Sequence, residues 1–326
     1  MELVRVSYRN ETAVLVSKEQ IEYVESDLSY TEKELIVKTK LLGVCTSDCL
    51  NYINNNSHYF GHELIAEVIS DYGDFKKGDM VTIFHKHGCQ NCLNCKNNLF
   101  HLCLSATYVP VGFQNYIRVP HESINNCVFK VPKSEDYTEY VFLDSISCVT
   151  HAIGKLNLTT KKEKVLILGT GFMAMLFAML LKNENKEVEL WGRNPKKISN
   201  INHHLPELKF INSIEEIGKY DICIDTSGKS ELINELQECI LPQGQLLLFS
   251  KLDKPIVLDH FRNNEIVILF SKHTTRADIQ KSIELISKNE ITTKPFLTFF
   301  NHLHDLEGAI RRTLSHDIVR GVITLD

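Results

Sequence analysis

Apolar and polar residues alternate in short runs through the first third of the chain, which is the pattern of half-buried β-strands. Such runs occur at residues 13–16, 34–38 and 64–69. A turn and a further strand follow at residues 75–83, and another turn and strand at residues 112–119. The pattern predicts that the N-terminal third is built mainly of β-strands.

The pattern changes near Tyr140, where strand-like and helix-like runs begin to alternate. Strands are predicted at residues 165–168, 188–191, 222–225, 245–249 and 266–269, with helices between them such as residues 230–240. This alternation predicts an α/β fold with a parallel, doubly wound sheet. The final stretch predicts helices at residues 277–288 and 306–314 and a last strand at residues 319–325.

Length and composition narrow the class of protein. A chain of 326 residues is too long for one ordinary hydrophobic core, so we expect two domains. A net charge of −5 argues against a nucleic-acid-binding surface. No apolar run approaches the roughly 20 residues of a membrane span, and the start has no signal-peptide pattern. We therefore expect a cytoplasmic protein with no membrane or nucleic-acid partner, in which clustered cysteines bind metal rather than form disulfides.

Four cysteines form the most specific pattern in the chain. They are Cys89, Cys92, Cys95 and Cys103. Four thiolates in one loop can fill all positions of a tetrahedral zinc, and metal binding would then supply the folding energy of a loop with few apolar residues. The spacing predicts a structural zinc site. Four unrelated free cysteines, or a lobe that has lost its metal, are the alternatives.

A second candidate metal site lies earlier in the chain. It comprises two short segments, Gly43-Val44-Cys45-Thr46-Ser47-Asp48 and Gly61-His62-Glu63. They place a thiolate, an imidazole and several oxygen ligands within about twenty residues, which suits zinc. The pattern alone is weak, because a Cys and a His at this separation occur by chance in many chains.

A glycine motif, Gly169-x-Gly171-x-x-Ala174, follows a predicted strand and opens a predicted helix. Gly169 permits the tight turn, Gly171 lets the backbone approach a pyrophosphate, and Ala174 allows close packing of helix on strand. The helix N-terminus supplies amide donors for the phosphates. This context predicts a dinucleotide site, with an ordinary glycine turn as the alternative.

The residues after the next strand indicate which dinucleotide is bound. An NAD site has an acid there for the ribose hydroxyls, but this chain has Gly192 followed by Arg193. A guanidinium can grip a 2′-phosphate through paired hydrogen bonds. We therefore expect NADP(H) to be preferred over NAD(H), unless Arg193 stacks on the adenine or is simply solvated.

Together these motifs resemble the zinc-containing medium-chain dehydrogenase/reductase family, which includes the alcohol and polyol dehydrogenases. The resemblance extends nearly end to end and includes Gly78-Asp79-Met80-Val81 and Asp225-Thr226-Ser227-Gly228. It implies a GroES-like catalytic domain at residues 1–145 and 290–326, and a Rossmann domain at residues 146–289, with the coenzyme in the cleft between them. It also implies two zinc ions per chain and a homodimer or homotetramer.

The resemblance assigns roles to individual residues. Cys45, His62 and Asp144 match the catalytic zinc ligands, with Cys148 as a rival to Asp144. Ser47 matches the residue that passes the hydroxyl proton, and Asp48 matches an acid that orients the ligating imidazole. Glu63 matches a carboxylate that can approach the metal.

The implied reaction is zinc-dependent hydride transfer between NADP(H) and a secondary alcohol or ketone. The carboxylate ligand, with a polar substrate mouth formed by Asn51, Tyr52 and His58, suggests a polyol, sugar alcohol or sugar phosphate. Two departures from the family favour an alternative, a non-catalytic zinc and dinucleotide-binding structural or sensor protein, whereas the intact set of Cys45, His62 and Asp144 disfavours it. The loop before His62 is short, and Leu50 replaces the expected relay histidine.

Overall fold

The computed structural model describes residues 6–31, 33–56, 60–159 and 162–325. The chain divides into two compact units: unit 1 is Met1–Asp144 with Thr292–Asp326, and unit 2 is Ser145–Ile291. No helix within the described ranges is long and apolar enough to cross a membrane.

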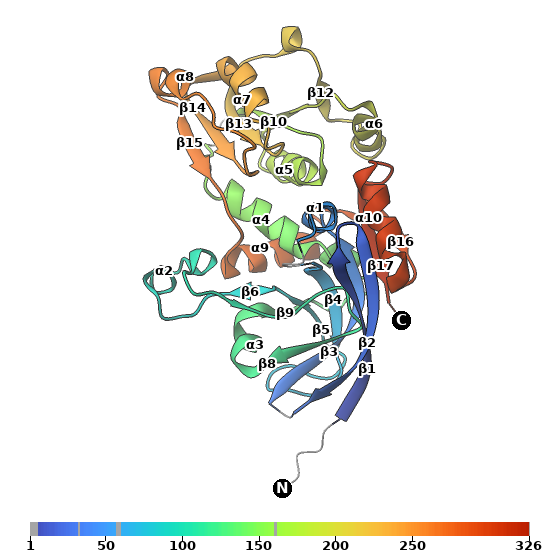
Figure 1. Ribbon diagram of the computed structural model, residues 1–326. Coiled ribbons are helices and arrows are strands. Elements are labelled where there is room, and N and C mark those ends of the chain that lie inside the picture. The colour runs from blue at the N-terminus through green and yellow to red at the C-terminus, as the bar shows by residue number, and fades with distance from the viewer. Residues whose placement is uncertain (1–5, 32, 57–59, 160–161, 326) are drawn as a thin grey trace. The chain divides into compact units, whose positions relative to one another are not determined.

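Unit 1 is built on a mainly antiparallel sheet, shown in the lower part of Figure 1. Its strands are β3 (Glu34–Val44), β4 (Glu63–Val68), β5 (Met80–Ile83), β8 (Tyr116–Pro120), β9 (Val128–Lys130), β16 (Leu297–Phe300) and β17 (Arg320–Thr324). In the part of the chain that the structure describes, their order is β16-β17-β3-β4-β5-β9, with β8 also paired to β3. The β-rich N-terminal part predicted from the sequence is confirmed.

Among the described residues, the rest of unit 1 consists of two β-ribbons and short helices. The ribbons pair β1 (Val6–Ser17) with β2 (Gln20–Tyr30) and β6 (Lys86–His87) with β7 (Thr107–Tyr108). The α-helices are α1 (Thr46–Asn54), α2 (Leu93–Lys96), α3 (His121–Cys127) and α10 (Leu306–Leu314). Short 3₁₀ turns lie at Phe100–Leu102, Thr138–Tyr140, Lys294–Phe296 and Leu303–Asp305.

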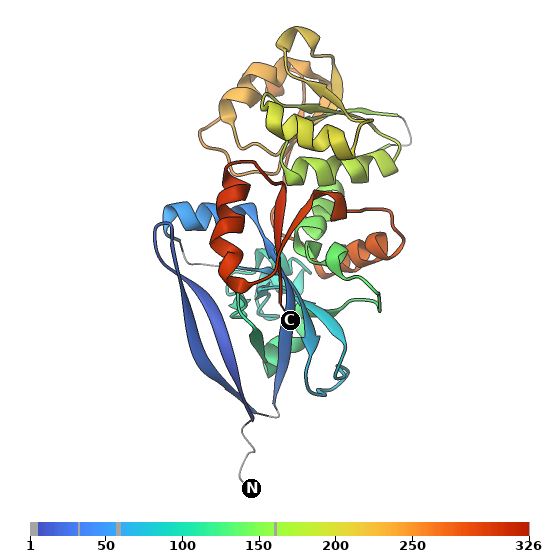
Figure 2. The ribbon, with the colours of Figure 1, turned by 90° about the vertical axis from the view of Figure 1, so that its right-hand side faces the viewer.

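The C-terminal segment completes the sheet of unit 1. Strand β17 pairs antiparallel with β3, so that Gly321 lies opposite Val44. Figures 1 and 2 show this red segment beside the blue N-terminal strands. Apolar residues of α10 and β17, including Ile310 and Ile323, are buried in the same core as Leu64 of β4. Packing between residues far apart in sequence therefore holds the end of β3, where Cys45 begins the next helix.

Unit 2 contains a parallel, doubly wound sheet with helices on both faces (Figure 2). Its strands are β10 (Lys164–Leu168), β11 (Glu187–Trp191), β12 (Lys209–Ile211), β13 (Tyr220–Asp225), β14 (Ile240–Leu248) and β15 (Val267–Phe270). The described strands run in the order β12-β11-β10-β13-β14-β15. The order reverses between β10 and β13, which is where this type of sheet binds dinucleotides. The fold class predicted from the sequence is confirmed.

The helices of unit 2 follow its strands in turn. They are α5 (Phe172–Asn183), α6 (Pro195–His204), α7 (Ser230–Leu236), α8 (Asp259–Asn263) and α9 (Arg276–Ser287), and α4 (Leu143–Ile153) precedes β10. Short 3₁₀ turns lie at Ile214–Glu216 and Gln237–Cys239. The helix expected at residues 230–240 is shorter than predicted, because α7 ends at Leu236 and β14 already begins at Ile240. Both α7 and β14 contain buried apolar residues, so hydrophobicity alone does not show where the helix ends and the strand begins.

Candidate functional site

The start of α1 brings the first candidate ligands together. Strand β3 ends at Val44, and Cys45 is the N-cap residue of α1. The buried Asp48 carboxylate accepts the Cys45 N–H through Oδ2 at 2.9 Å and the Gly61 N–H through Oδ1 at 2.8 Å. One side chain therefore ties the Cys45 turn to the loop that carries His62.

Gly61 is needed at this position in the loop. Its φ is 83°, a left-handed conformation that disfavours other residues. A Cβ there would also lie 2.6 Å from the Phe113 backbone nitrogen. The loop can follow this path only with a glycine immediately before His62.

Three possible ligand atoms meet at this point. One ligand atom each from Cys45, His62 and Glu63 lies within 4.8 Å of the others. His62 Nδ1 lies 3.6 Å from Asp48 Oδ1, and His62 Nε2 lies 4.0 Å from Asp144 Oδ2. The group that could hold a metal ion is thus Cys45, His62 and Glu63, while Asp144, from the first turn of α4, lies near the imidazole of His62. Cys148, one turn further along α4, is half-buried.

The electrostatics of this cluster favour a cation. Burial lowers the pKa of His62, but Asp48 and Cys45 raise it, and the net pKa is well above the usual value. Burial raises the pKa of Asp144, and the charge of His62 opposes that shift. A divalent cation would balance the surrounding acidic groups, and thiolate, imidazole and carboxylate are all zinc ligands. The residues present therefore fit a zinc ion.

Arg320 is a residue of this cluster that the sequence did not reveal. It is 1% exposed, its Nη1 donates to the Val44 carbonyl oxygen at 3.0 Å, and its guanidinium lies 5.6 Å from the centre of the Phe142 ring. Burial lowers its pKa, but Cys45 and Glu63 raise it, and the net shift is upward. The only feature of the sequence that singled out Arg320 was its charge within the apolar pattern of the last strand. Its position in the sequence does not predict a contact with the Cys45 region.

The four cysteines of the lobe also meet. Their sulfur atoms lie within 4.8 Å of one another, with Cys92 Sγ 3.6 Å from Cys95 Sγ and 3.8 Å from Cys103 Sγ. Backbone N–H groups of Cys95 and Leu104 lower the pKa of Cys92 to about 6, which favours the thiolate. The arrangement can hold a tetrahedral zinc without leaving an open position.

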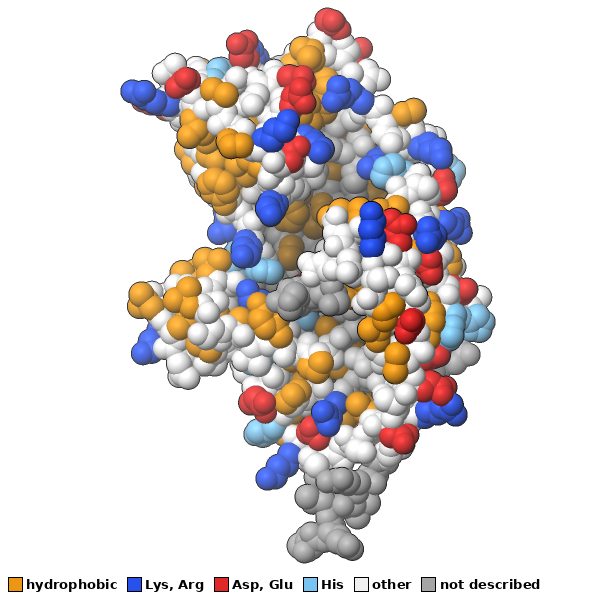
Figure 3. All heavy atoms as spheres, viewed as in Figure 1, with side chains coloured by type: hydrophobic (Ala, Val, Ile, Leu, Met, Phe, Trp, Pro, Cys, Tyr) orange, Lys and Arg blue, Asp and Glu red, His pale blue; other side chains and the backbone are white. Residues whose placement is uncertain are grey.

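The lobe has little apolar packing of its own. Figure 3 shows hydrophobic side chains on its surface around α2. Leu93 is 70% exposed and Leu104 is 80% exposed. Because these leucines do not form a core, metal binding is the clearest source of order for the lobe.

The structure does not support Tyr52 as part of the expected substrate mouth, whereas the predicted proton-transfer residue Ser47 is accessible. Ser47 is exposed on the first turn of α1. Tyr52 does not line a mouth, because it is buried and its hydroxyl donates to the Glu19 carbonyl at 2.9 Å and to Glu307 at 2.8 Å. Tyr52 thus lies on the side of α1 that packs against α10, a contact that the sequence could not predict. His58 lies outside the described residues.

In unit 2, the glycine motif forms the turn between β10 and α5. Gly169 has a φ of 129°, and a Cβ there would lie 2.5 Å from Thr226 Oγ1. Gly171 is the N-cap residue of α5, and a Cβ on it would meet no described atom within 4 Å. Ala174 is fully buried against the sheet. Open backbone at a helix N-terminus is the geometry that binds a phosphate group.

The end of β11 lies beside this turn. The Gly169 N–H donates to the Trp191 carbonyl oxygen at 2.9 Å, and Gly192 follows Trp191. Arg193 is exposed, and the Asn194 side chain accepts the Lys197 N–H at the N-terminus of α6. The structure therefore places Gly192 next to the glycine turn, with the exposed Arg193 directly after it and no carboxylate at position 192.

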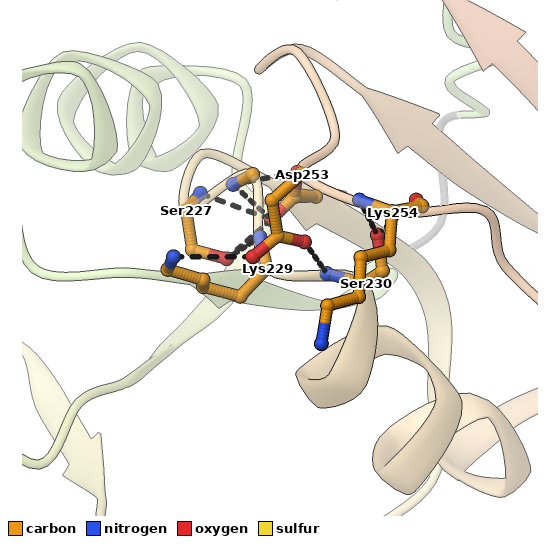
Figure 4. A network of polar contacts seen from close by, with 7 residues as sticks. Ser227, Lys229, Ser230, Asp253 and Lys254 are labelled. Carbon is orange, nitrogen blue, oxygen red and sulfur yellow. Dashed lines mark hydrogen bonds and ion pairs between the residues drawn. The ribbon is translucent and has the colours of Figure 1, made fainter.

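A polar network fixes the turn after β13, the strand that pairs with β10 on the side opposite β11 (Figure 4). Asp225 Oδ1 accepts the Ser227 N–H at 2.9 Å and the Ser227 hydroxyl at 2.7 Å. Asp253 accepts the Ser230 N–H at 3.0 Å and pairs with Lys229 at 3.1 Å. Because Thr226 lies in this turn and contacts the Gly169 position, the network also supports the glycine motif.

Comparison with known proteins agrees with this architecture. Residues 31–133 match the alcohol dehydrogenase GroES-like domain. Glucose 1-dehydrogenase of Metallosphaera sedula is 25% identical over 78% of this chain and 80% of its own length. Sorbitol dehydrogenase of Bacillus subtilis is 23% identical, with 86% of each chain covered. The crystal structure of L-idonate 5-dehydrogenase from Escherichia coli covers 98% of this chain and 99% of its own, with a TM-score of 0.86 and 18% identity.

A GroES-like unit joined to a Rossmann unit defines the two-part dehydrogenase architecture. Within that class, the matched GroES-like domain and the curated relatives support the zinc-containing medium-chain dehydrogenase/reductase family.

Proposed function

We propose that the protein is a zinc-dependent dehydrogenase that transfers a hydride between NADP(H) and a secondary alcohol or ketone. The observation that carries this proposal is the cluster of Cys45, His62 and Glu63 in unit 1, with Asp144 4.0 Å from the imidazole of His62. The matched GroES-like domain and the curated relatives support the coarser statement, that the chain is an oxidoreductase acting on alcohols.

The chain's own residues would hold and orient a catalytic zinc. Cys45, His62 and Asp144 are the proposed ligands. Glu63 lies beside the positive charge of Arg320, so its carboxylate already has a partner in the protein, whereas Asp144 faces His62. Asp48 holds the Cys45 and Gly61 backbones and so fixes the position of the imidazole.

The chemistry is divided between bound groups and side chains. When bound, zinc polarises the substrate oxygen as a Lewis acid and the nicotinamide accepts or gives the hydride. Ser47, exposed on the first turn of α1, would receive or return the hydroxyl proton. Cys89, Cys92, Cys95 and Cys103 would hold a second, structural zinc.

The proposed coenzyme is NADP(H) rather than NAD(H). Gly171 and the N-terminus of α5 would receive the pyrophosphate, and Arg193 the 2′-phosphate. We expect Arg193→Gln to lower kcat/KM for NADPH by about tenfold, because one charge-assisted interaction is worth about 1.5 kcal/mol or more. The same change at Arg262, exposed on α8 of the same unit, should leave the ratio of NADPH to NADH use unchanged. A wild-type preference for NADH would contradict this assignment.

The proposed substrates are polyols, sugar alcohols or sugar phosphates. The named relatives with sugar or polyol substrates support this class. A panel of secondary alcohols and ketones, followed by NADPH absorbance, tests it. We also propose a homodimer or homotetramer, as in the family.

Cys45→Ser separates the enzyme from a non-catalytic zinc and dinucleotide-binding protein. It should abolish turnover while NADP(H) still binds, because Cys45 lies in unit 1 and the glycine turn in unit 2. Full activity in this variant would contradict the proposal. The non-catalytic alternative was suggested by Leu50, which stands where the relay histidine was expected and is half exposed.

A further inference from the structure

Gly192 and Gly171 are both glycines of the candidate coenzyme site, but they differ in their surroundings. No described atom would lie within 4 Å of a Cβ on Gly171, whereas a Cβ on Gly192 would lie 2.1 Å from Thr170 Cγ2. The same Cβ would lie 3.2 Å from both Thr170 Cβ and Thr170 Oγ1. The space beside Gly192 is therefore filled by one side chain of the glycine turn.

The backbone at Gly192 does not itself require glycine. Its φ is not in the left-handed range that Gly169 and Gly228 adopt. Any L-residue could therefore take its conformation. The restriction at position 192 is steric, and it comes from the Thr170 methyl group.

Thr170 cannot easily withdraw. It is 9% exposed, and its turn is held on one side by the Gly169 N–H bond to the Trp191 carbonyl. On the other side Thr226 approaches the Gly169 position, and the Thr226 hydroxyl donates to the Leu168 carbonyl at 2.9 Å. Threonine is also branched at Cβ, so two of its three staggered positions are always filled.

We propose that Thr170 and Gly192 form a specificity-determining steric pair, in which the Thr170 methyl group excludes an acidic residue, and any other side chain, from the end of β11. The acid that binds the ribose hydroxyls of NAD occupies this strand end. Coenzyme choice would then depend on Thr170 as well as on Gly192 and Arg193. The link to coenzyme choice rests on the proposed function, but the steric exclusion does not.

A stability cycle without coenzyme tests the steric pair. Gly192→Ala is made in the wild type, in Thr170→Ser, which removes the methyl, and in Thr170→Val, which keeps a branched Cβ. We expect Gly192→Ala to lower Tm by roughly 5 °C in the wild type and in Thr170→Val. In Thr170→Ser it should have little effect. An equal loss in all three backgrounds, or no loss in any, would overturn the proposal.

Coenzyme kinetics test the consequence. Gly192→Asp is compared in the wild type and in Thr170→Ser, using kcat/KM for NADH and NADPH. We expect the Thr170→Ser, Gly192→Asp variant to fold and to shift the ratio towards NADH by about tenfold or more. Gly192→Asp alone should be less stable than the double variant and should shift the ratio of kcat/KM towards NADH by less. If the single variant folds and shifts as fully as the double variant, the pair is refuted.

The outcomes separate the two proposals. A wild-type enzyme that prefers NADH would refute the proposed coenzyme preference, while the stability cycle would still decide on the steric pair. A cycle without coupling would refute the pair and leave the NADP(H) proposal standing on Arg193.

Discussion

At the scale of single residues, the sequence predicted which types of side chain would cluster but not all the members. Cys45, His62 and Asp144 were selected by spacing and resemblance, and the structure places His62 near each of the other two. Arg320 was not selected, because only the pairing of β17 with β3 brings it to Val44 and Cys45. Contacts between residues 276 positions apart leave no periodic signal in the sequence.

The two carboxylates of the catalytic cluster should respond differently to substitution. Asp144→Asn removes a proposed ligand and should lower zinc affinity by more than the about 10–100-fold loss typical of an outer partner. Glu63→Gln should fall within that range, since Arg320 already accompanies Glu63. Zinc content after dialysis against a chelator measures both, with Cys148→Ser as the test of the rival ligand. A larger loss in Glu63→Gln or Cys148→Ser than in Asp144→Asn would reverse the assignment.

At the scale of elements, the sequence predicted the strands and helices whose apolar periodicity is strong, but not α1, α3, α6, α8 or β12. The predicted helix at 306–314 matches α10, and the predicted strand at 165–168 lies within β10. The short strands of the lobe and the end of α7 were not predicted. In the lobe the order comes from sulfur ligands rather than from a hydrophobic pattern.

The lobe should therefore lose its order when a ligand is removed. Cys92→Ser should lower the zinc content by one ion per chain and accelerate amide exchange in residues 89–103. Ser105→Ala is the matched control, because it changes a lobe side chain without removing a thiolate. Hydrogen exchange followed by mass spectrometry measures the effect. Unchanged protection in Cys92→Ser would mean that metal does not order the lobe.

A buried ion pair fixes the beginning of the sheet in unit 2. Lys186 Nζ lies 2.7 Å from Glu163 and donates to the Thr159 carbonyl at 2.6 Å. The two side chains are 3% and 9% exposed. Lys186→Met leaves a buried carboxylate unpaired and should lower the free energy of unfolding at pH 7 by about 3 kcal/mol. Adding Glu163→Gln should recover part of that loss, as urea unfolding can show.

The stabilisation by the Lys186–Glu163 pair should depend on pH. Burial raises the pKa of Glu163, but Lys186 and Thr159 lower it, and the net folded pKa is below the usual value. The stabilisation is therefore present above the unfolded pKa of about 4.3 and is lost as the pH falls through the folded pKa. The difference between wild type and Lys186→Met should shrink below about pH 4.3. A difference that stays constant down to pH 3 would contradict this account.

At the scale of the whole molecule, each unit carries a candidate site of its own. Unit 1 holds the two clusters of metal ligands, and unit 2 holds the glycine turn and Arg193. The α/β class and its parallel sheet followed from the alternation of strand and helix patterns. The return of residues 292–326 to unit 1 came from the family resemblance, because periodicity does not show which sheet a strand joins.

The central claim is that unit 1 binds zinc through Cys45 as well as through the lobe. The most direct measurement is the zinc content per chain of the purified wild type and of Cys45→Ser. The account predicts two zinc ions in the wild type and one in the variant. A single zinc ion in the wild type that Cys45→Ser retains would contradict it.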